Sequence, residues 1–183
     1  MIALAVGLAL AVDPSVKPWP VGVGPGYRPP AATATVTAGA SVNGLRCSVN
    51  GKTFPVHVEL FANRRVVAIP AGIGVARPYR TTLGAVDPQG CSYPVKTLTP
   101  TGIVDVAKGM RLTVGDLFRV WGQPLGPRRL GSFASREPVR AYLGGRIVRG
   151  AASSIPLTSG EEIVLEIGGY VPPHPSFLFP KGS

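Results

Sequence analysis

Glycine and proline restrict the fold of this chain more than any other feature of its sequence. Its 183 residues include 24 glycines and 20 prolines. Both destabilise helix interiors, because proline lacks a backbone N–H and glycine leaves the backbone too free. The sequence therefore argues against a helical bundle and predicts short strands joined by many turns. A hydrophobic share of 45% supplies enough apolar side chains for a buried core at this length.

The N-terminal part differs in composition from the rest of the chain. Residues 1–11 form an apolar run ending in Ala-Leu-Ala, a small-x-small pattern typical of signal-peptidase sites. The run is shorter than the roughly 20 residues of a membrane-spanning helix. We interpret it as a signal peptide or a truncated anchor; a buried first strand is the alternative. Residues 12–43 are rich in Pro, Ala and Thr and predict an extended linker. A single compact domain is expected over residues 44–183.

The first half of that domain, residues 44–100, contains a β-hairpin pattern. In the run VHVELF, which begins at Val56, apolar residues alternate with His57, Glu59 and an aromatic residue. His57 and Glu59 therefore share the strand face that points away from the core, about 7 Å apart. A turn at Asn63-Arg64 leads into the second strand. The stretch 71–90 is interpreted as a loop.

The second half, residues 101–170, predicts a strand in TGIVDVA, a helix, a hairpin around Gly144-Gly145 and a last strand in EEIVLEI. The helix is expected at about 113–121, because Thr113 is a good N-cap and an apolar stripe follows at helical spacing. This order resembles the second half of a β-grasp domain. The predicted fold is mainly β, or α+β, with antiparallel hairpins around one central amphipathic helix.

The last segment, residues 171–183, is spaced by prolines. We expect an extended tail that lies across the domain, with Phe177 and Phe179 as apolar anchors.

The chain has two cysteines, Cys47 and Cys91. An even number of cysteines in a chain with an export signal favours one disulfide. Two unpaired buried thiols are the alternative that the residues leave open.

The net charge is +10, from 19 Lys and Arg against 9 acidic residues. The excess is concentrated between residues 111 and 150, where eight arginines face two acidic residues. Such a surface either keeps the protein soluble or attracts an anionic polymer or a lipid surface. Nucleic acid is not favoured, because the chain shows no recognition-helix pattern, zinc-finger spacing or RNP strand. The candidate contact residues are Arg128, Arg129, Arg136 and Arg140.

Five stretches of the chain form a recognisable set. They are Cys47 with the strand VHVELFANRRVVAIPAGIG, then CSYPVKTLTPTGIVDV, LTVGDLFRVWGQPL, VRAYLGGR and IPLTSGEEIVLEIG. Together they resemble an uncharacterised family of exported bacterial proteins. The family has a His-x-His pair on the first strand and a Cys-x-Tyr-x-x-His-Thr-His-Asp-x-Thr-Gly-Ile-Ile-His motif, followed by Leu-Gly-x-Phe-Phe-x-x-Trp-Gly. The resemblance implies that Cys47 pairs with Cys91.

Most of the family's histidines are replaced in this chain. The positions that match its second-motif histidines and its aspartate are Lys96, Leu98, Asp105 and Thr99. Leucine has no donor atom and lysine is protonated at neutral pH, so neither replaces an imidazole. Because converging imidazoles and carboxylates suit zinc or copper, the candidate metal ligands are His57, Glu59 and Asp105. A contact between His57 and Asp105 is expected if their strands pair.

Common catalytic motifs do not occur. The chain has no Gly-x-Ser-x-Gly elbow, His-Glu-x-x-His helix or P-loop. Glu161, Glu162 and Glu166 are assigned to turn and strand structure rather than to glycoside hydrolysis. We therefore expect a non-catalytic binding module rather than an enzyme. We expect it to be exported and to be extracellular or associated with the cell envelope. Its expected partner is an anionic polymer, a lipid surface or an envelope protein. The alternatives are a metal-binding protein and a structural or assembly protein of the envelope.

Overall fold

The computed structural model describes residues 39–48 and 51–181. The predicted signal peptide and nearly all of the predicted linker lie outside these ranges. Within them the chain is mainly β, as predicted, with one α-helix. The elements are β1 (Ser41–Val42), β2 (Leu45–Arg46), β3 (Thr53–Ala62), β4 (Arg65–Val67), β5 (Tyr79–Thr82), β6 (Ala85–Pro88), β7 (Val95–Lys96), β8 (Ile103–Ala107), α1 (Val114–Trp121), β9 (Leu125–Gly126), β10 (Arg129–Leu130), β11 (Phe133–Ala134), β12 (Arg140–Leu143), β13 (Arg146–Ile147), the 3-10 turn η1 (Ala152–Ser154) and β14 (Glu162–Ile167).

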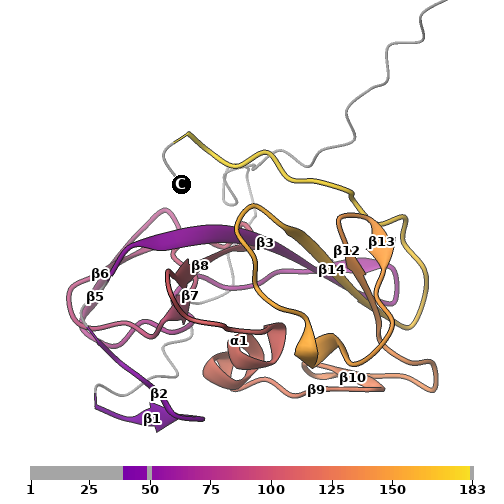
Figure 1. The fold of residues 1–183 in the computed structure, drawn as a ribbon, viewed down its shortest axis with the longest axis horizontal. Helices are drawn as coiled ribbons and strands as arrows, with labels where there is room; N and C mark the ends of the chain where they lie inside the picture. Colours follow the sequence, from indigo (N-terminus) through magenta and orange to yellow (C-terminus); the bar gives the residue numbers. More distant parts are fainter. Residues whose placement is uncertain (1–38, 49–50, 182–183) are drawn as a thin grey trace, which may run out of the picture.

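One seven-stranded sheet organises the molecule. Its strand order is β13-β12-β14-β3-β8-β7, and β4 also pairs with β3. The central pair, β3 with β14, is parallel, whereas β3 pairs with β4 and with β8 in antiparallel fashion. The sheet therefore combines strands from both halves of the domain. Figure 1 shows α1 on one side of this sheet and the C-terminal tail on the other.

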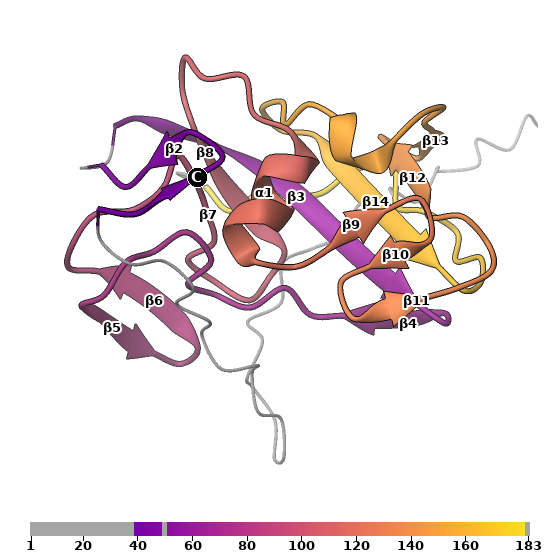
Figure 2. The ribbon, with the colours of Figure 1, turned by 90° about the horizontal axis from the view of Figure 1, so that it is seen from below.

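The apolar core lies between the sheet and α1. Alternation along β3 turns Val56, Val58 and Leu60 toward this core, and all three are buried. From the helix, the predicted apolar stripe is buried against them, with Phe118 and Trp121 in a tilted ring contact. Figure 2, seen from the helix side, places α1 across β3.

Both ends of α1 follow from its sequence. Thr113 is the N-cap: its hydroxyl accepts from the Asp116 N–H, and the Asp116 carboxylate accepts from the Thr113 N–H at 2.9 Å. This is the reciprocal capping box expected from the sequence. Gly122 ends the helix in the left-handed conformation, with φ of 73°.

The disulfide between Cys47 and Cys91 is present, with the two Cα atoms 5.4 Å apart. It joins the N-terminal β1–β2 hairpin to the segment that precedes β7. Next to it, Ser48 and Ser92 form a two-way backbone hydrogen-bond pair. Closing a loop between cysteines 44 residues apart stabilises the fold by about 4 kcal/mol in the chain-entropy account.

The prediction of a loop over 71–90 was wrong. This stretch contains the two-stranded sheet of β5 and β6, whose turn includes Leu83 and Gly84 with positive φ. Its first strand is half-buried or exposed along its length. Because it lacks alternating apolar and polar residues, the pattern that identifies a half-buried strand was absent.

None of the helices in the part of the chain that the structure describes has the length and apolar character needed to cross a membrane.

The capping box generates a stability prediction. Burial raises the pKa of Asp116, but hydrogen bonds from Arg119 and Thr113 outweigh it and hold the pKa below 3.8. A carboxylate with a lowered pKa stabilises the fold above its unfolded pKa, and this contribution is lost as the pH falls. Asp116→Asn should lower the free energy of unfolding at pH 7 by about 0.5–1 kcal/mol. Urea denaturation should show that the difference in free energy of unfolding between the wild type and Asp116→Asn becomes smaller in acid.

Glu137→Gln is the control, because it breaks the exposed pair with Arg140. It should leave stability unchanged within about 0.5 kcal/mol. Equal losses of stability in the two variants would contradict the capping role of Asp116.

Candidate functional site

The sheet face opposite α1 carries many ionisable side chains beside a small apolar cluster of Phe61, Tyr142 and Val164, which is unusual for a face that is largely covered. Because side chains alternate along a strand, the residues between the core positions of β3 and β14 all point to this face. The strand register aligns Glu162 with His57 and Val164 with Glu59. The ionisable side chains on this face are Lys96, Asp105, His57, Glu59, Glu162, Glu166, Arg140 and Tyr142.

His57 and Glu162 form a short, buried polar contact on this face. The His57 Nδ1 atom lies 2.6 Å from Glu162 Oε2, and the residues are 3% and 2% exposed. The other ring nitrogen, Nε2, lies 2.9 Å from the Thr101 carbonyl oxygen. Since a carbonyl only accepts, Nε2 carries a proton and donates it there. Both ring nitrogens of His57 are therefore engaged.

Burial keeps this pair neutral. Removal from water lowers the pKa of His57 to about 4, against the smaller opposing effects of Glu59 and the Thr101 carbonyl. Burial, followed by the nearby charge of Glu59, raises the pKa of Glu162 to about 9. The pair thus holds one exchangeable proton at neutral pH, on Glu162 Oε2, which donates to the unprotonated Nδ1 of His57.

The second oxygen of Glu162 has no partner. Oε1 is buried and makes no hydrogen bond within residues 39–48 and 51–181. Buried polar atoms are nearly always satisfied, so an orphan acceptor needs an explanation. Glu59, two residues along β3 from His57, brings another carboxylate to the same place. His57, Glu59 and Glu162 each offer a donor atom, and these atoms lie within 4.8 Å of one another. We call these three residues the His57 cluster.

Gly102 lets the backbone close over this cluster. Its φ is +80°, and a Cβ atom there would lie 2.8 Å from His57 Nε2 and 2.6 Å from the Val58 carbonyl oxygen. Glycine is therefore required both by conformation and by space. The close approach places the Thr101 carbonyl where it fixes the orientation of the His57 ring.

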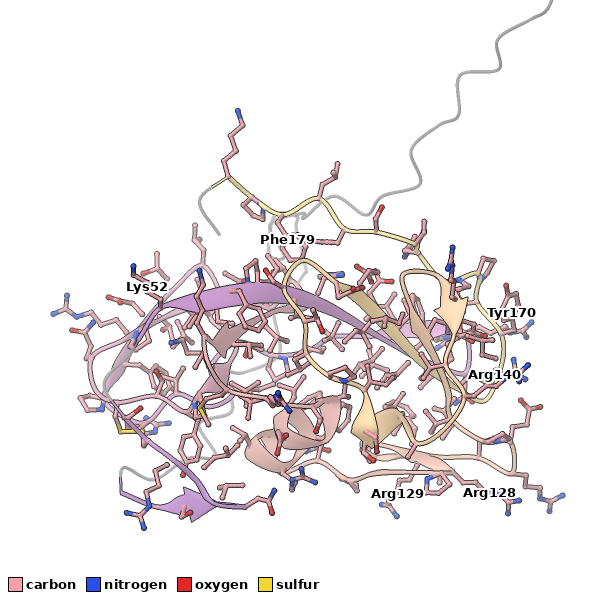
Figure 3. All side chains as sticks on the ribbon, in the orientation of Figure 1. Lys52, Arg128, Arg129, Arg140, Tyr170 and Phe179 are labelled. Atoms are coloured by element: carbon pink, nitrogen blue, oxygen red, sulfur yellow. A yellow bond between two sulfur atoms is a disulfide. The ribbon has the colours of Figure 1, made fainter. Side chains whose placement is uncertain are left out.

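The C-terminal tail covers the cluster. The Phe177 ring stacks on the His57 ring, with centroids 3.6 Å apart and planes 10° from parallel. His174 Nδ1 lies 2.7 Å from Glu59 Oε2. Phe177 is buried and its ring also meets that of Phe179 edge-on. Figure 3 shows Phe179 on the tail, above the sheet face that lies away from the helix.

The predicted metal ligands come together only in part. His57 and Glu59 belong to the cluster, but Asp105 lies outside it. Strand β8 does pair with β3, yet the register puts Asp105 opposite Pro55, and Ile103 opposite His57. Asp105 instead lies beside Lys96 in the β7–β8 pair. Burial raises the pKa of Asp105 and lowers that of Lys96, while the opposite charge of each partner works against the shift.

The four candidate arginines lie on different elements of the fold. Arg128, Arg129 and Arg136 are exposed around the small sheet of β9, β10 and β11. Arg140 lies on the large sheet, half-buried, and its guanidinium pairs with Glu137 at 3.3 Å. In Figure 3, Arg128 and Arg129 lie below the helix layer, whereas Arg140 lies to one side near Tyr170.

Sequence reasoning missed two members of the site. Glu162 was assigned a structural role, although the alternation of Ile163, Leu165 and Ile167 already placed it on the outer face. Its partner could not be identified without the pairing of strands 105 residues apart. His174, which lies between two prolines in the tail, was not among the predicted site residues. No signal within the sequence links it to Glu59.

Comparison with protein-family models, curated proteins and solved structures found no match. The resemblance to a family of exported bacterial proteins therefore stays a prediction.

The buried pair makes a prediction about stability and pH. In the metal-free folded protein it holds one proton between pH of about 4 and about 9. In the unfolded chain, where the pKa is 6.5 for His57 and 4.5 for Glu162, the two side chains hold no exchangeable proton above pH 6.5. The free energy of unfolding should therefore fall as pH rises from about 6.5 to about 9, by up to about 1.4 kcal/mol per unit.

Urea denaturation in EDTA tests this. Glu162→Gln keeps a neutral hydrogen-bond donor beside His57 and has no proton to lose, so its stability should lack this alkaline decline. Parallel pH profiles for the two proteins would show that Glu162 is already ionised in the folded state.

Proposed function

We propose that the protein is a metal-binding protein that holds one divalent transition-metal ion, zinc in the first place, at the His57 cluster. The observation that carries this proposal is the unpartnered Glu162 Oε1, buried beside an imidazole and a second carboxylate. A cation bound there would give this oxygen a partner. It would also offset the electrostatic repulsion between the carboxylates of Glu59 and Glu162.

The imidazole is already oriented as a ligand. Metal-binding histidines typically donate their other ring N–H to a backbone carbonyl or a carboxylate. The contact from His57 Nε2 to Thr101 has this form and leaves Nδ1 facing Glu162. Imidazole nitrogen with carboxylate oxygen is a donor set that zinc accepts, and copper(II) is the competing ion.

The spacing requires a small rearrangement on binding. With metal–ligand bonds of about 2.0–2.1 Å, donor atoms in a tetrahedral site are roughly 3.3 Å apart. In the cluster, His57 Nδ1 lies 2.6 Å from Glu162 Oε2, and the donor atoms of the three residues lie within 4.8 Å of one another. Zinc would bind Glu162 as an ionised carboxylate and His57 through Nδ1, so that binding releases the proton that the two residues share.

We also propose that the protein works outside the reducing cytoplasm, as an extracellular or envelope protein. The Cys47–Cys91 disulfide supports this location, since such bonds persist mainly in oxidising compartments. The metal would then be taken from, or held within, the extracellular environment.

Isothermal titration of EDTA-treated protein with Zn²⁺ and Cu²⁺ tests the proposal. One zinc per chain is expected. Glu162→Gln should weaken zinc affinity by at least about 100-fold, because losing a group that only hydrogen-bonds to a metal ligand already weakens affinity by about 10–100-fold. Asp105→Asn is the matched control, because Asp105 lies on the same face but outside the cluster, and it should bind like the wild type. Circular dichroism confirms folding of each variant. Wild-type protein that remains zinc-free at millimolar Zn²⁺, or equal affinity in wild type and Glu162→Gln, would refute the proposal.

A second candidate function is binding of an anionic surface by Arg128, Arg129 and Arg136. These exposed arginines have no ion-pair partner among the residues that the structure places. Pro127, next to Arg128, lines a mainly apolar cavity of about 360 Å³ together with Leu125, Pro138 and Val139. Exposed positive charge beside apolar surface suits an anionic lipid layer.

Sedimentation with phosphatidylglycerol vesicles tests this second function. Replacing Arg128, Arg129 and Arg136 together by Gln should weaken binding by at least about tenfold, at about 1 kcal/mol per basic residue near the surface. Lys52→Gln, at the opposite end of the molecule (Figure 3), should have little effect. Binding that is insensitive both to salt and to the arginine replacements would exclude this surface.

A further inference from the structure

The C-terminal tail crosses the polar face as a strap, which we define as residues 171–181. Its contacts begin at the Val171 N–H, which donates to Glu166 Oε1 at 3.1 Å. Pro175 then packs on the turn between β12 and β13, where a Cβ atom on Gly145 would lie 3.1 Å from its Cα. Phe177 stacks on His57. The strap is therefore seated on the sheet at several points and contacts His57 and Glu59 of the cluster. Figure 1 shows this segment on the side of the sheet away from α1.

His174 is the strap residue that reaches the cluster with a donor atom. Its Nδ1 lies 2.7 Å from Glu59 Oε2, although the two residues are 115 positions apart. The side chain is 40% exposed, against 15% for Glu59 and 4% for His57. His174 is thus the most exposed member of a group in which His57 and Glu162 are buried and Glu59 is half-buried. In the metal-free structure this imidazole contacts Glu59 but is not among the donor atoms that lie within 4.8 Å of one another. Ligation by His174 therefore requires its side chain to turn from Glu59 toward the bound ion.

We infer that His174 is the fourth ligand of the proposed metal site, so that metal binding fastens the strap to the sheet. This inference rests on the proposed function. The ligand set would comprise two imidazoles and two carboxylates, which completes the four-coordinate shell that zinc adopts in closed protein sites. Three ligands come from the sheet and one from the tail.

The strap is shaped to present this ligand. His174 lies between Pro173 and Pro175, whose rings fix their own φ angles and restrict the residue before each of them. Little further backbone entropy is lost when the imidazole is held in place. The stacked Phe177, three residues on, keeps the strap in register over His57.

Two measurements on the full chain test the role of His174. The first is zinc titration of His174→Ala beside Leu178→Ala, an exposed residue of the same strap. His174→Ala should weaken zinc affinity by about 100-fold, and Leu178→Ala should leave it unchanged. The second is hydrogen exchange in residues 171–181 with and without zinc. Zinc should slow exchange there at least about tenfold in the wild type and in Leu178→Ala, but not in His174→Ala.

The outcomes separate this inference from the function on which it rests. If the wild type binds zinc and Glu162→Gln does not, while His174→Ala binds as tightly as wild type with equal strap protection, the inference is overturned and the metal site stands. If the wild type binds no zinc, both are overturned. A Co²⁺-loaded sample adds a direct signature, since loss of one nitrogen ligand in His174→Ala should alter the visible absorption bands. Identical spectra would count against ligation by His174.

Discussion

The parallel pairing of β3 with β14 is the contact on which the rest of this structure depends. It joins the two halves of the domain at the centre of the main sheet and aligns Glu162 with His57. On one face the same register gathers the apolar side chains that pack on α1. On the other it gathers the ionisable groups. A slip of one residue would bring Glu162 into the core and expose its apolar neighbours, so the buried faces hold the register firmly.

The polar face carries an energetic cost that the fold alone does not require. Burying a histidine and a carboxyl group is unfavourable even as a neutral pair, and apolar residues of similar volume often serve stability as well or better. Here one oxygen of Glu162 also has no partner among the residues that the structure describes. Costly titratable groups of this kind concentrate at functional sites. The tail covers them with one aromatic ring and one imidazole, which keeps water out while leaving a donor atom at the edge of the cluster.

Local patterns predicted most of the elements, and long-range pairing explains what they did not. The capped helix, the β3–β4 hairpin and strand β8 follow from capping residues, a turn and alternation over a few positions. Alternation also placed His57 and Glu59 on one face. It could not select Glu162 over Asp105 as their neighbour, because both lie on strands next to β3 and only the register distinguishes them. Hairpin β5–β6 was missed because its first strand is mostly exposed and lacks an alternating apolar face. The contact between His174 and Glu59 depends on the path of the tail, which no local rule describes.

The most direct test of the account is anomalous diffraction at the zinc absorption edge from crystals of the full chain grown with Zn²⁺. The account predicts one strong peak bounded by His57 Nδ1 and the carboxylates of Glu59 and Glu162, below the tail. Well-diffracting crystals with no peak there, and with the His57–Glu162 contact still at its metal-free distance of 2.6 Å, would contradict it. The buried pair would then be a structural element of the sheet.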